Sequence, residues 1–204
     1  YDAATRTRYT GARGEHYWVQ ESYTEMVDGR PQQRVRNVRK TRWRAASGVV
    51  ENSFDDVLVP ASKSIDSGRL EDLEPWDLAK VEPYQPSFLA GFKAQRYQVG
   101  LEEGLTLARA RMEPEIQRTI RADIGGDEQR IVSMEVAMEG VTFKHLLLPV
   151  WLGAYRYKEK VYQVAVNART GEVSGERPYS AAKIVGAVIL ALVVIAILAW
   201  AGRQ

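Results

Sequence analysis

Residues 16–44 read HYWVQESYTEMVDGRPQQRVRNVRKTRWR, and this stretch determines the architecture that we predict for the N-terminal region. Its first part is rich in Tyr, Trp, Val and Thr, which favour strands. Asp28-Gly29 is a strong signal for a two-residue type I′ turn, so the sequence predicts a β-hairpin. The turn also fixes which residues face each other. The expected cross-strand pairs are Val27–Arg30, Tyr23–Arg34, Glu21–Arg36, Val19–Val38, Tyr17–Lys40 and Glu15–Arg42.

The second arm of this hairpin is the most basic stretch of the chain. Five cations share one face at the two-residue period of a strand: Arg34, Arg36, Lys40, Arg42 and Arg44. One interpretation is a surface for nucleic acid or anionic lipid, because Lys and Arg neutralise phosphates. The interpretation that we favour is a solvated face neutralised by the acidic residues of the partner strand, since opposite charges across a ladder stabilise it.

Beyond the hairpin, the sequence predicts a third strand over 47–60 and short helices over 64–80. The region from Gln98 to Ile124 places apolar residues at helical spacing, ends at Gly125-Gly126 and is the best candidate for a long amphipathic helix. Strands are expected over 130–137, 142–157 and 160–167, with a short return at 172–175. We expect the helix to lie on this C-terminal meander.

Residues 184–201 read IVGAVILALVVIAILAWA and contain no charged side chain. As a helix they would span about 27 Å, close to the hydrocarbon thickness of a bilayer. We therefore predict a tail-anchored, single-pass protein of the cell inner membrane. Its soluble domain would lie in the cytoplasm, since no signal-peptide pattern occurs before the tail. The anchor residues are Ile184, Val185, Ile189, Leu190, Leu192, Val193, Val194, Ile195, Ile197, Leu198 and Trp200.

Together these features predict an α+β fold: antiparallel β-hairpins and a meander, one long amphipathic helix and a single C-terminal transmembrane helix. Four regions are expected. They are a β-hairpin-rich region (1–63), a helical, proline-rich connector (64–97), the helix with the meander (98–180) and the transmembrane helix (183–202).

The sequence shows no catalytic constellation. It has no cysteine and two isolated histidines, His16 and His145, which we expect to be structural. Asp55 and Asp56 are adjacent in a predicted strand and would point to opposite faces, so we do not expect them to converge on a metal ion. If the protein were an enzyme, these two and Asp123 would be its best acids. The formal net charge of +2 requires no polyanionic partner.

Two long passages carry a family resemblance. They are YDAATRTRYTGARGEHYWV (1–19), followed by VRKTRWRAASGVVENSFDDVLVPAS (38–62), and FKHLLLPVWLGAYRYKEKVYQVAVNARTGEVSGERPYSAAKI (143–184). They resemble bacterial proteins that contain a TFIIB-type zinc ribbon, many of which are called primosomal protein N′ (replication factor Y), superfamily II helicase. The resemblance covers most of residues 1–183.

This family resemblance implies a four-cysteine zinc ribbon, often a hydrophobic tail, and partners such as band-7 (SPFH) scaffold proteins. The chain has no cysteine, so no zinc ligand carries over, and we expect no cofactor in it; any zinc would belong to a ribbon outside this sequence. A helicase needs a phosphate-binding loop and an acidic metal-binding motif, and neither is present.

The expected function is therefore a non-enzymatic, membrane-anchored adaptor or scaffold that contacts the bilayer and protein partners of a membrane complex. Homo-oligomerisation stays open. The alternative is binding of nucleic acid or anionic lipid through the basic strand 34–44, although the self-paired charges do not favour a nucleic-acid partner.

Overall fold

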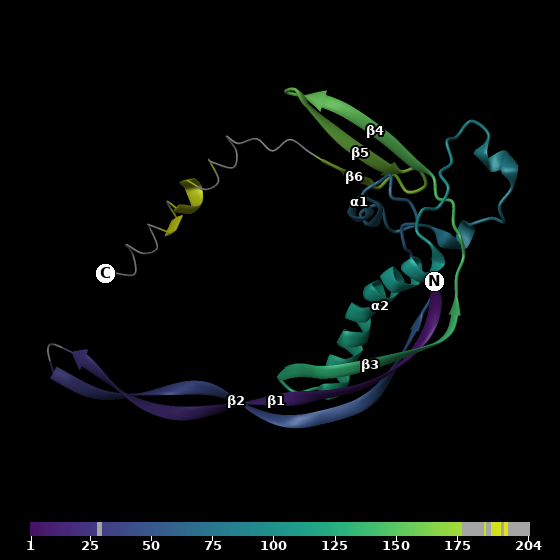
Figure 1. Cartoon of the computed structure of the whole chain (residues 1–204). Coiled ribbons are helices and arrows are strands. Elements are labelled where there is room, and N and C mark those ends of the chain that lie inside the picture. Colours follow the sequence, from purple (N-terminus) through teal and green to yellow (C-terminus); the bar gives the residue numbers. More distant parts are fainter. Residues whose placement is uncertain (28–29, 177–185, 187–188, 193, 196–204) are drawn as a thin grey trace. The chain divides into compact units, whose positions relative to one another are not determined.

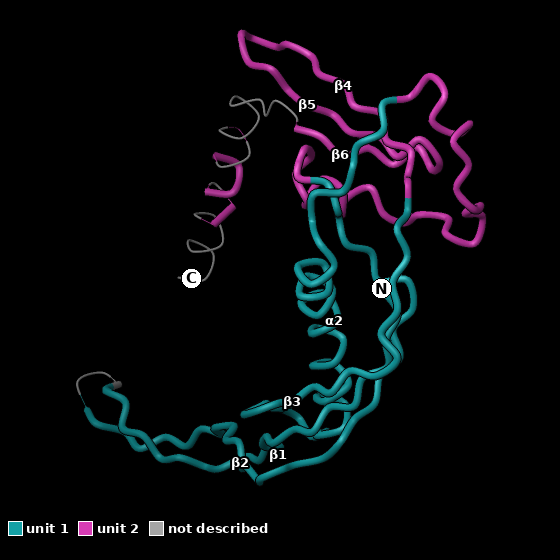
Figure 2. The backbone as a smooth tube through the Cα atoms, turned by 45° about the vertical axis from the view of Figure 1, so that its right-hand side comes forward, with its two compact units in different colours: residues 1–62, 93–146 teal, residues 63–92, 147–204 magenta. Residues whose placement is uncertain are grey.

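The structure is a computed structural model that describes residues 1–27, 30–176, 186, 189–192 and 194–195 of the 204-residue chain. The chain divides into two compact units, 1–62 with 93–146 and 63–92 with 147–204 (Figure 2). Each contains a three-stranded antiparallel sheet. Unit 1 combines the predicted hairpin region with the first part of the predicted 98–180 region.

The sheet of unit 1 has the order β2-β1-β3 (Figure 1). Its strands are β1 (Asp2–Val27), β2 (Arg30–Phe54) and β3 (Glu128–Thr142). β1 and β2 pair in the register that the sequence predicts, and all six expected cross-strand pairs are confirmed. The turn residues 28–29 themselves lie outside the described residues.

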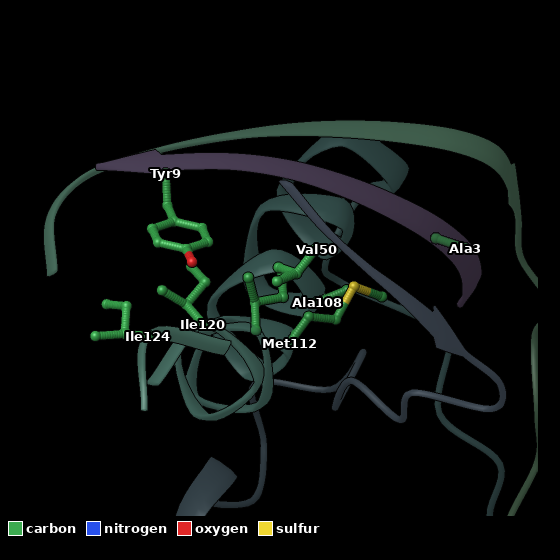
Figure 3. Packing of buried hydrophobic residues seen from close by; sticks show 8 residues of the cluster. Ala3, Tyr9, Val50, Ala108, Met112, Ile120 and Ile124 are labelled. Carbon is green, nitrogen blue, oxygen red and sulfur yellow. The ribbon is translucent and has the colours of Figure 1, made fainter. Parts of the chain in front are cut away.

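The helix α2 (Leu101–Ile124) packs on this sheet and forms the core of unit 1 (Figure 3). Its buried residues recur at helical spacing and are Gly104, Ala108, Met112, Ile116, Ile120 and Ile124. They meet the buried odd-numbered positions at the start of β1, from Ala3 to Tyr9, and Val50 of β2.

The prediction that α2 lies on the C-terminal meander holds for its first strand alone: the helix contacts β3, which contains residues 130–137, but packs also on β1 and β2. The physical reason is the pattern of burial. β1 alternates buried and exposed residues from Ala3 to Thr10 and so offers an apolar face. β4 (Val150–Tyr157) is exposed from Trp151 to its end and offers no such burial.

The predicted α+β class is wrong, because the described part of the chain is mostly β. β1 and β2 run for 26 and 25 residues. β2 continues through 47–54, where a separate third strand was predicted. The helices expected over 64–80 are reduced to α1 (Ser67–Glu71) and the 3-10 turn η1 (Leu78–Lys80). A second 3-10 turn, η2 (Pro86–Leu89), follows.

The predicted transmembrane helix over 183–202 requires correction, and with it the tail anchor and the single-pass inner-membrane location. Among the described residues, no helix is long and apolar enough to cross a membrane. Ile189, Leu190, Leu192, Val194 and Ile195 are exposed. The other predicted anchor residues lie outside the described residues: Ile184, Val185, Val193, Ile197, Leu198 and Trp200.

Unit 2 contains the sheet β4-β5-β6, completed by β5 (Lys160–Asn167) and β6 (Val173–Gly175). Asn167 is fully buried and organises its turn. Its side-chain amide donates to the Leu73 carbonyl at 2.9 Å, and its Oδ1 accepts the N–H groups of Arg169 and Thr170 at 2.9 and 3.1 Å. This one side chain therefore ties the β5–β6 turn to the segment after α1, where Leu73 is fully buried.

Candidate functional site

The most prominent feature of unit 1 is a two-stranded extension of its sheet. β3 stops where Glu128 lies opposite Gly14, whereas β1 and β2 continue together. We call residues 15–27 and 30–42 the ribbon; Figure 1 shows it extending beyond β3 and α2. Because paired residues of an antiparallel ladder share a face, the ribbon has two faces of different composition.

One face of the ribbon carries the predicted cations, and most of them are paired with the opposite strand. Arg34 Nε lies 3.1 Å from Glu25 Oε2, and Lys40 Nζ lies 2.7 Å from Glu21 Oε1. Arg36 Nη2 lies 3.8 Å from Glu21 Oε2. The hydrogen bond from Lys40 lowers the pKa of Glu21 below its usual value, and in turn raises the pKa of Lys40.

Aromatic rings contact two of these cations. The Arg36 guanidinium lies 5.4 Å from the centre of the Tyr23 ring, and that of Arg42 lies 5.1 Å from the Tyr17 ring. Such contacts are attractive because the ring face is electron-rich. Arg44, the fifth predicted cation, lies opposite Arg13 beyond the ribbon. Three of the five predicted cations thus pair with acids of the opposite strand, whereas Glu15, the predicted partner of Arg42, pairs with Arg13.

The other face of the ribbon is uncharged except at Arg39, over the described positions 18–26 and 31–39. Three large apolar side chains stand out on it: Trp18, Met26 and Val35 are 68%, 66% and 61% exposed. The polar residues between them are Gln20, Ser22, Thr24, Gln33 and Asn37. We call this the neutral face. The sequence prediction missed this face because the charged residues at the alternate positions dominate the pattern.

The base of the ribbon is fixed by His16, which the sequence presented as isolated. Its Nε2 lies 2.7 Å from Glu128 Oε1, and its backbone N–H donates to Asp127 Oδ2 at 2.7 Å. The Thr41 hydroxyl donates to the same Glu128 oxygen at 3.1 Å. These contacts, led by the hydrogen bond with His16, lower the pKa of Glu128. Sequence spacing could not reveal this partner, because Glu128 is 112 residues away.

Asp55 and Asp56 do converge, contrary to the expectation from strand alternation. Carboxylate oxygens of Asp2, Asp55 and Asp56 lie within 4.8 Å of one another. Alternation does not apply, because β2 ends at Phe54 and Asp56 adopts a positive φ of 55°. Oxygen ligands of this kind are the ones that could hold a hard cation such as Ca²⁺.

In the structure, Lys144 provides the positive charge for this acidic cluster. Its Nζ lies 3.4 Å from Asp56 Oδ1 and 3.5 Å from Asp2 Oδ2. The pKa of Asp2 is lowered, first by the backbone N–H of Asp56 at 2.8 Å and also by the Thr142 hydroxyl at 3.0 Å. These contacts join the start of β1, the end of β2 and the end of β3, so the cluster serves as a structural junction.

The remaining predicted site residues lie apart from the ribbon's neutral face. Asp123 Oδ2 accepts a hydrogen bond from the Tyr9 hydroxyl at 2.5 Å. The His145 ring stacks on Tyr97, with 4.7 Å between the ring centres. In unit 2, an open, shallow groove of about 980 Å³ is lined in part by Asp72 and Glu176.

Two of the three acids that line this groove, Asp72 and Glu176, are engaged within unit 2. Asp72 accepts the Ser174 hydroxyl at 3.0 Å, and Glu176 pairs with Arg69 at 2.7 Å. The polar lining of the groove therefore holds neighbouring segments of the unit together.

Comparison with known proteins adds little to this geometry. No family model matches the chain, and no solved structure matches it. A curated protein described as "Uncharacterized protein YdjG", from Bacillus subtilis (strain 168), is 28% identical over 127 residues, which is 62% of this chain and 37% of the relative. The chain thus spans little more than a third of that relative's length. The resemblance to zinc-ribbon proteins stays a prediction.

Proposed function

We propose that this protein is a non-enzymatic scaffold module that binds a protein partner through the neutral face of its ribbon. The observation that carries the proposal is the unequal division of the ribbon. One face pairs part of its charge across the strands, Arg34 with Glu25 and both Arg36 and Lys40 with Glu21. The other face exposes Trp18, Met26 and Val35 among polar residues whose one charge is Arg39. The three side chains lie four residues apart along the ladder, all on this one face, where a partner strand or helix could contact them in series.

The geometry of the ribbon supports this role. A two-stranded ribbon has no second layer packed against it. The apolar side chains of the ribbon are therefore not buried in a hydrophobic core and do not stabilise the fold in that way. The cross-strand ion pairs of the charged face stabilise the ribbon while leaving the opposite face free. At the base, His16 and Thr41 attach the ribbon to β3 through Glu128. The neutral face is thus presented on a support with fixed strand register.

The partner best suited to this face is a protein surface with apolar residues and an acidic residue to pair with Arg39, which lies opposite Trp18, because buried charges without counter-charges are costly. Trp is among the residues that contribute most to binding interfaces, so Trp18 is the expected centre of the contact. The family resemblance suggests one class to test, the band-7 scaffold proteins.

Site-specific photo-crosslinking in the native cell tests the proposal. A benzoylphenylalanine at Trp18 should give one dominant protein adduct, and the same group at Tyr17, on the opposite face, should not. The second substitution Val35→Glu should remove the adduct at position 18. Equal labelling from both faces, or an adduct that persists with Val35→Glu, would contradict a specific interface on the neutral face.

Anion binding through Arg34–Arg44 is the second candidate, and the charge pairs on that face argue against it. Fluorescence anisotropy with duplex and single-stranded DNA separates the two functions. The chain should show no steeply salt-dependent binding, and Arg34→Glu, Arg36→Glu and Arg42→Glu together should change little. Tight binding that weakens with salt and is lost in this triple variant would establish the anion-binding function instead.

A further inference from the structure

The sheet of unit 2 has two very different edges. β6 is three residues long and is flanked by Glu172 and Glu176, so it offers little backbone and a negative charge. Short strands and charges are the usual protection of an exposed edge. β4, at the other edge, is eight residues long and forms its ladder with β5 without a bulge.

β4 also lacks protection by its side chains. It reads VWLGAYRY, with no proline, lysine or acidic residue and one charge, at Arg156. Trp151 and Leu152 point to opposite faces of the sheet and are 65% and 63% exposed. An edge strand that is long, regular and apolar on both faces is a template for another strand.

We propose that β4 pairs antiparallel with β4 of a second copy of this chain, around a two-fold axis at Ala154. Such an axis, perpendicular to the sheet, places opposite each other only residues that share a face. With the axis at Ala154, residues 151–157 of one copy pair antiparallel with residues 157–151 of the other, so that Ala154 lies opposite Ala154. The two three-stranded sheets then form one sheet of six strands. This proposal rests on unit 2 alone and is independent of the ribbon.

The sequence of β4 complements itself in this register. Trp151 faces Tyr157 of the second copy on one face of the sheet, and the symmetry repeats this aromatic pair. On the other face, Leu152 lies against the aliphatic stem of Arg156 of the second copy. No two like charges are opposed within the paired segment. Aromatic cross-strand pairs are among the most stabilising in antiparallel sheets, which favours a second copy over an unrelated strand.

One face of the sheet is uncovered at the centre of β4, where the Cβ direction is out of the sheet plane. A Cβ added to Gly153 would meet no atom within 4 Å. Tyr155, which would face Gly153 of the second copy, is directed inward: its ring stacks on Tyr162 at 5.3 Å, and its hydroxyl donates to the Glu176 carbonyl at 3.1 Å. Neither residue obstructs an approaching strand.

The first test measures the mass of the full chain in solution over a range of concentrations. The mass of the wild-type protein should approach twice 23.0 kDa as the concentration rises. Trp151→Lys adds a charge to the edge strand and should weaken the dimer at least tenfold, so that the variant is mainly monomeric. Trp18→Lys, an equally exposed tryptophan in the ribbon, is the matched control and should stay dimeric. A monomeric wild type, or a Trp151→Lys dimer of unchanged strength, would overturn the proposal.

The second test fixes the register and uses the natural absence of cysteine. Ala154→Cys places two thiols directly opposite each other, at about 4.5–5.5 Å between Cα atoms, within disulfide range. Leu152→Cys, on the same face, is the control, because its two copies would lie about 14 Å apart. Mild oxidation should crosslink the Ala154→Cys variant and leave the Leu152→Cys variant monomeric on a denaturing gel. The reverse pattern would overturn this register.

Discussion

The hydroxyl of Tyr9 donates a hydrogen bond to Asp123 Oδ2 at 2.5 Å, and so joins the central strand β1 to the last turn of α2. The two residues are 114 positions apart in the sequence. The Tyr9 ring is 3% exposed, and Figure 3 shows it directed from the sheet toward the helix. Burial, followed by the hydrogen bond to Asp123, raises the pKa of Tyr9 to about 12.

Tyr9→Phe should lower the free energy of unfolding by about 1 kcal/mol at neutral pH, the usual net contribution of a hydrogen bond. Because the folded-state pKa lies above the ordinary tyrosine pKa of 10.0, the stabilisation is present below pH 10 and is lost as the pH rises toward 12. Urea unfolding at pH 7 and at alkaline pH measures both effects. Tyr17→Phe, on the exposed ribbon, is the control and should change the free energy of unfolding little. A difference in unfolding free energy between wild type and Tyr9→Phe that increases above pH 10 would contradict this account.

Gly11 lies where β3 approaches β1 most closely. A Cβ at this position would come within 2.4 Å of the Arg130 carbonyl oxygen and 2.9 Å of Ile124 Cδ1. Gly11→Ala should therefore cost about 1–3 kcal/mol of stability, because a backbone atom cannot move aside like a flexible side chain. Gly100→Ala, where a Cβ meets nothing within 4 Å, should cost less, about 0.5–1 kcal/mol, because Gly100 is the N-cap of α2 and Ala is a poorer N-cap than Gly. Thermal unfolding of the two variants measures the difference. Similar melting temperatures for Gly11→Ala and Gly100→Ala would contradict the close approach of the Arg130 carbonyl to Gly11.

Glu128→Gln should destabilise the ribbon's base in a pH-dependent way. The pKa of Glu128 is lowered in the folded state, mainly by His16, so its contribution to stability is present above the ordinary glutamate pKa of 4.5 and is lost as the pH falls further. The melting temperature of the variant should lie below wild type at pH 7, and the difference should shrink below pH 4.5. Glu135→Gln, exposed on the same strand, should show no such convergence.

The turn between β4 and β5 is built from residues poorly suited to it. Lys158 and Glu159 have φ angles of 47° and 65°, the pattern of a type I′ turn, for which Asn-Gly is preferred. Lys158→Asn with Glu159→Gly should stabilise the hairpin by about 1 kcal/mol, because left-handed backbone is costly for other residues. Slower amide hydrogen exchange across 150–167 would show it. Lys160→Gly, inside β5, should accelerate exchange instead.

The sequence predicted what local signals control. Asp28-Gly29 and the alternation around it were enough to determine the pairing of Val19 with Val38 and of Glu21 with Arg36. The buried stripe of α2 through Ala108, Met112, Ile116 and Ile120 also followed from helical spacing.

Long-range relations were not predictable in this way. No local signal indicates that β3 pairs with β1 rather than with the following strands, so the meander was assigned the wrong partner. The acidic cluster was not predicted because Asp2 is far from Asp55 in the sequence. In addition, the positive φ of Asp56 breaks the strand alternation that would have placed Asp55 and Asp56 on opposite faces. The neutral face could have been predicted, because the predicted cross-strand register places Trp18, Val35 and Met26 on the same face of the hairpin.

The placement of β1 between β2 and β3 has a consequence for synthesis on the ribosome. β2 ends at Phe54, but β3 is complete only at Thr142, so one edge of the central strand has no partner while the intervening residues are made. At about 5–20 residues per second, this interval lasts roughly 4–18 s. Throughout it, the nascent hairpin carries an unpaired edge and lacks α2, so the protection of this strand in the cell depends on translation speed and chaperone access.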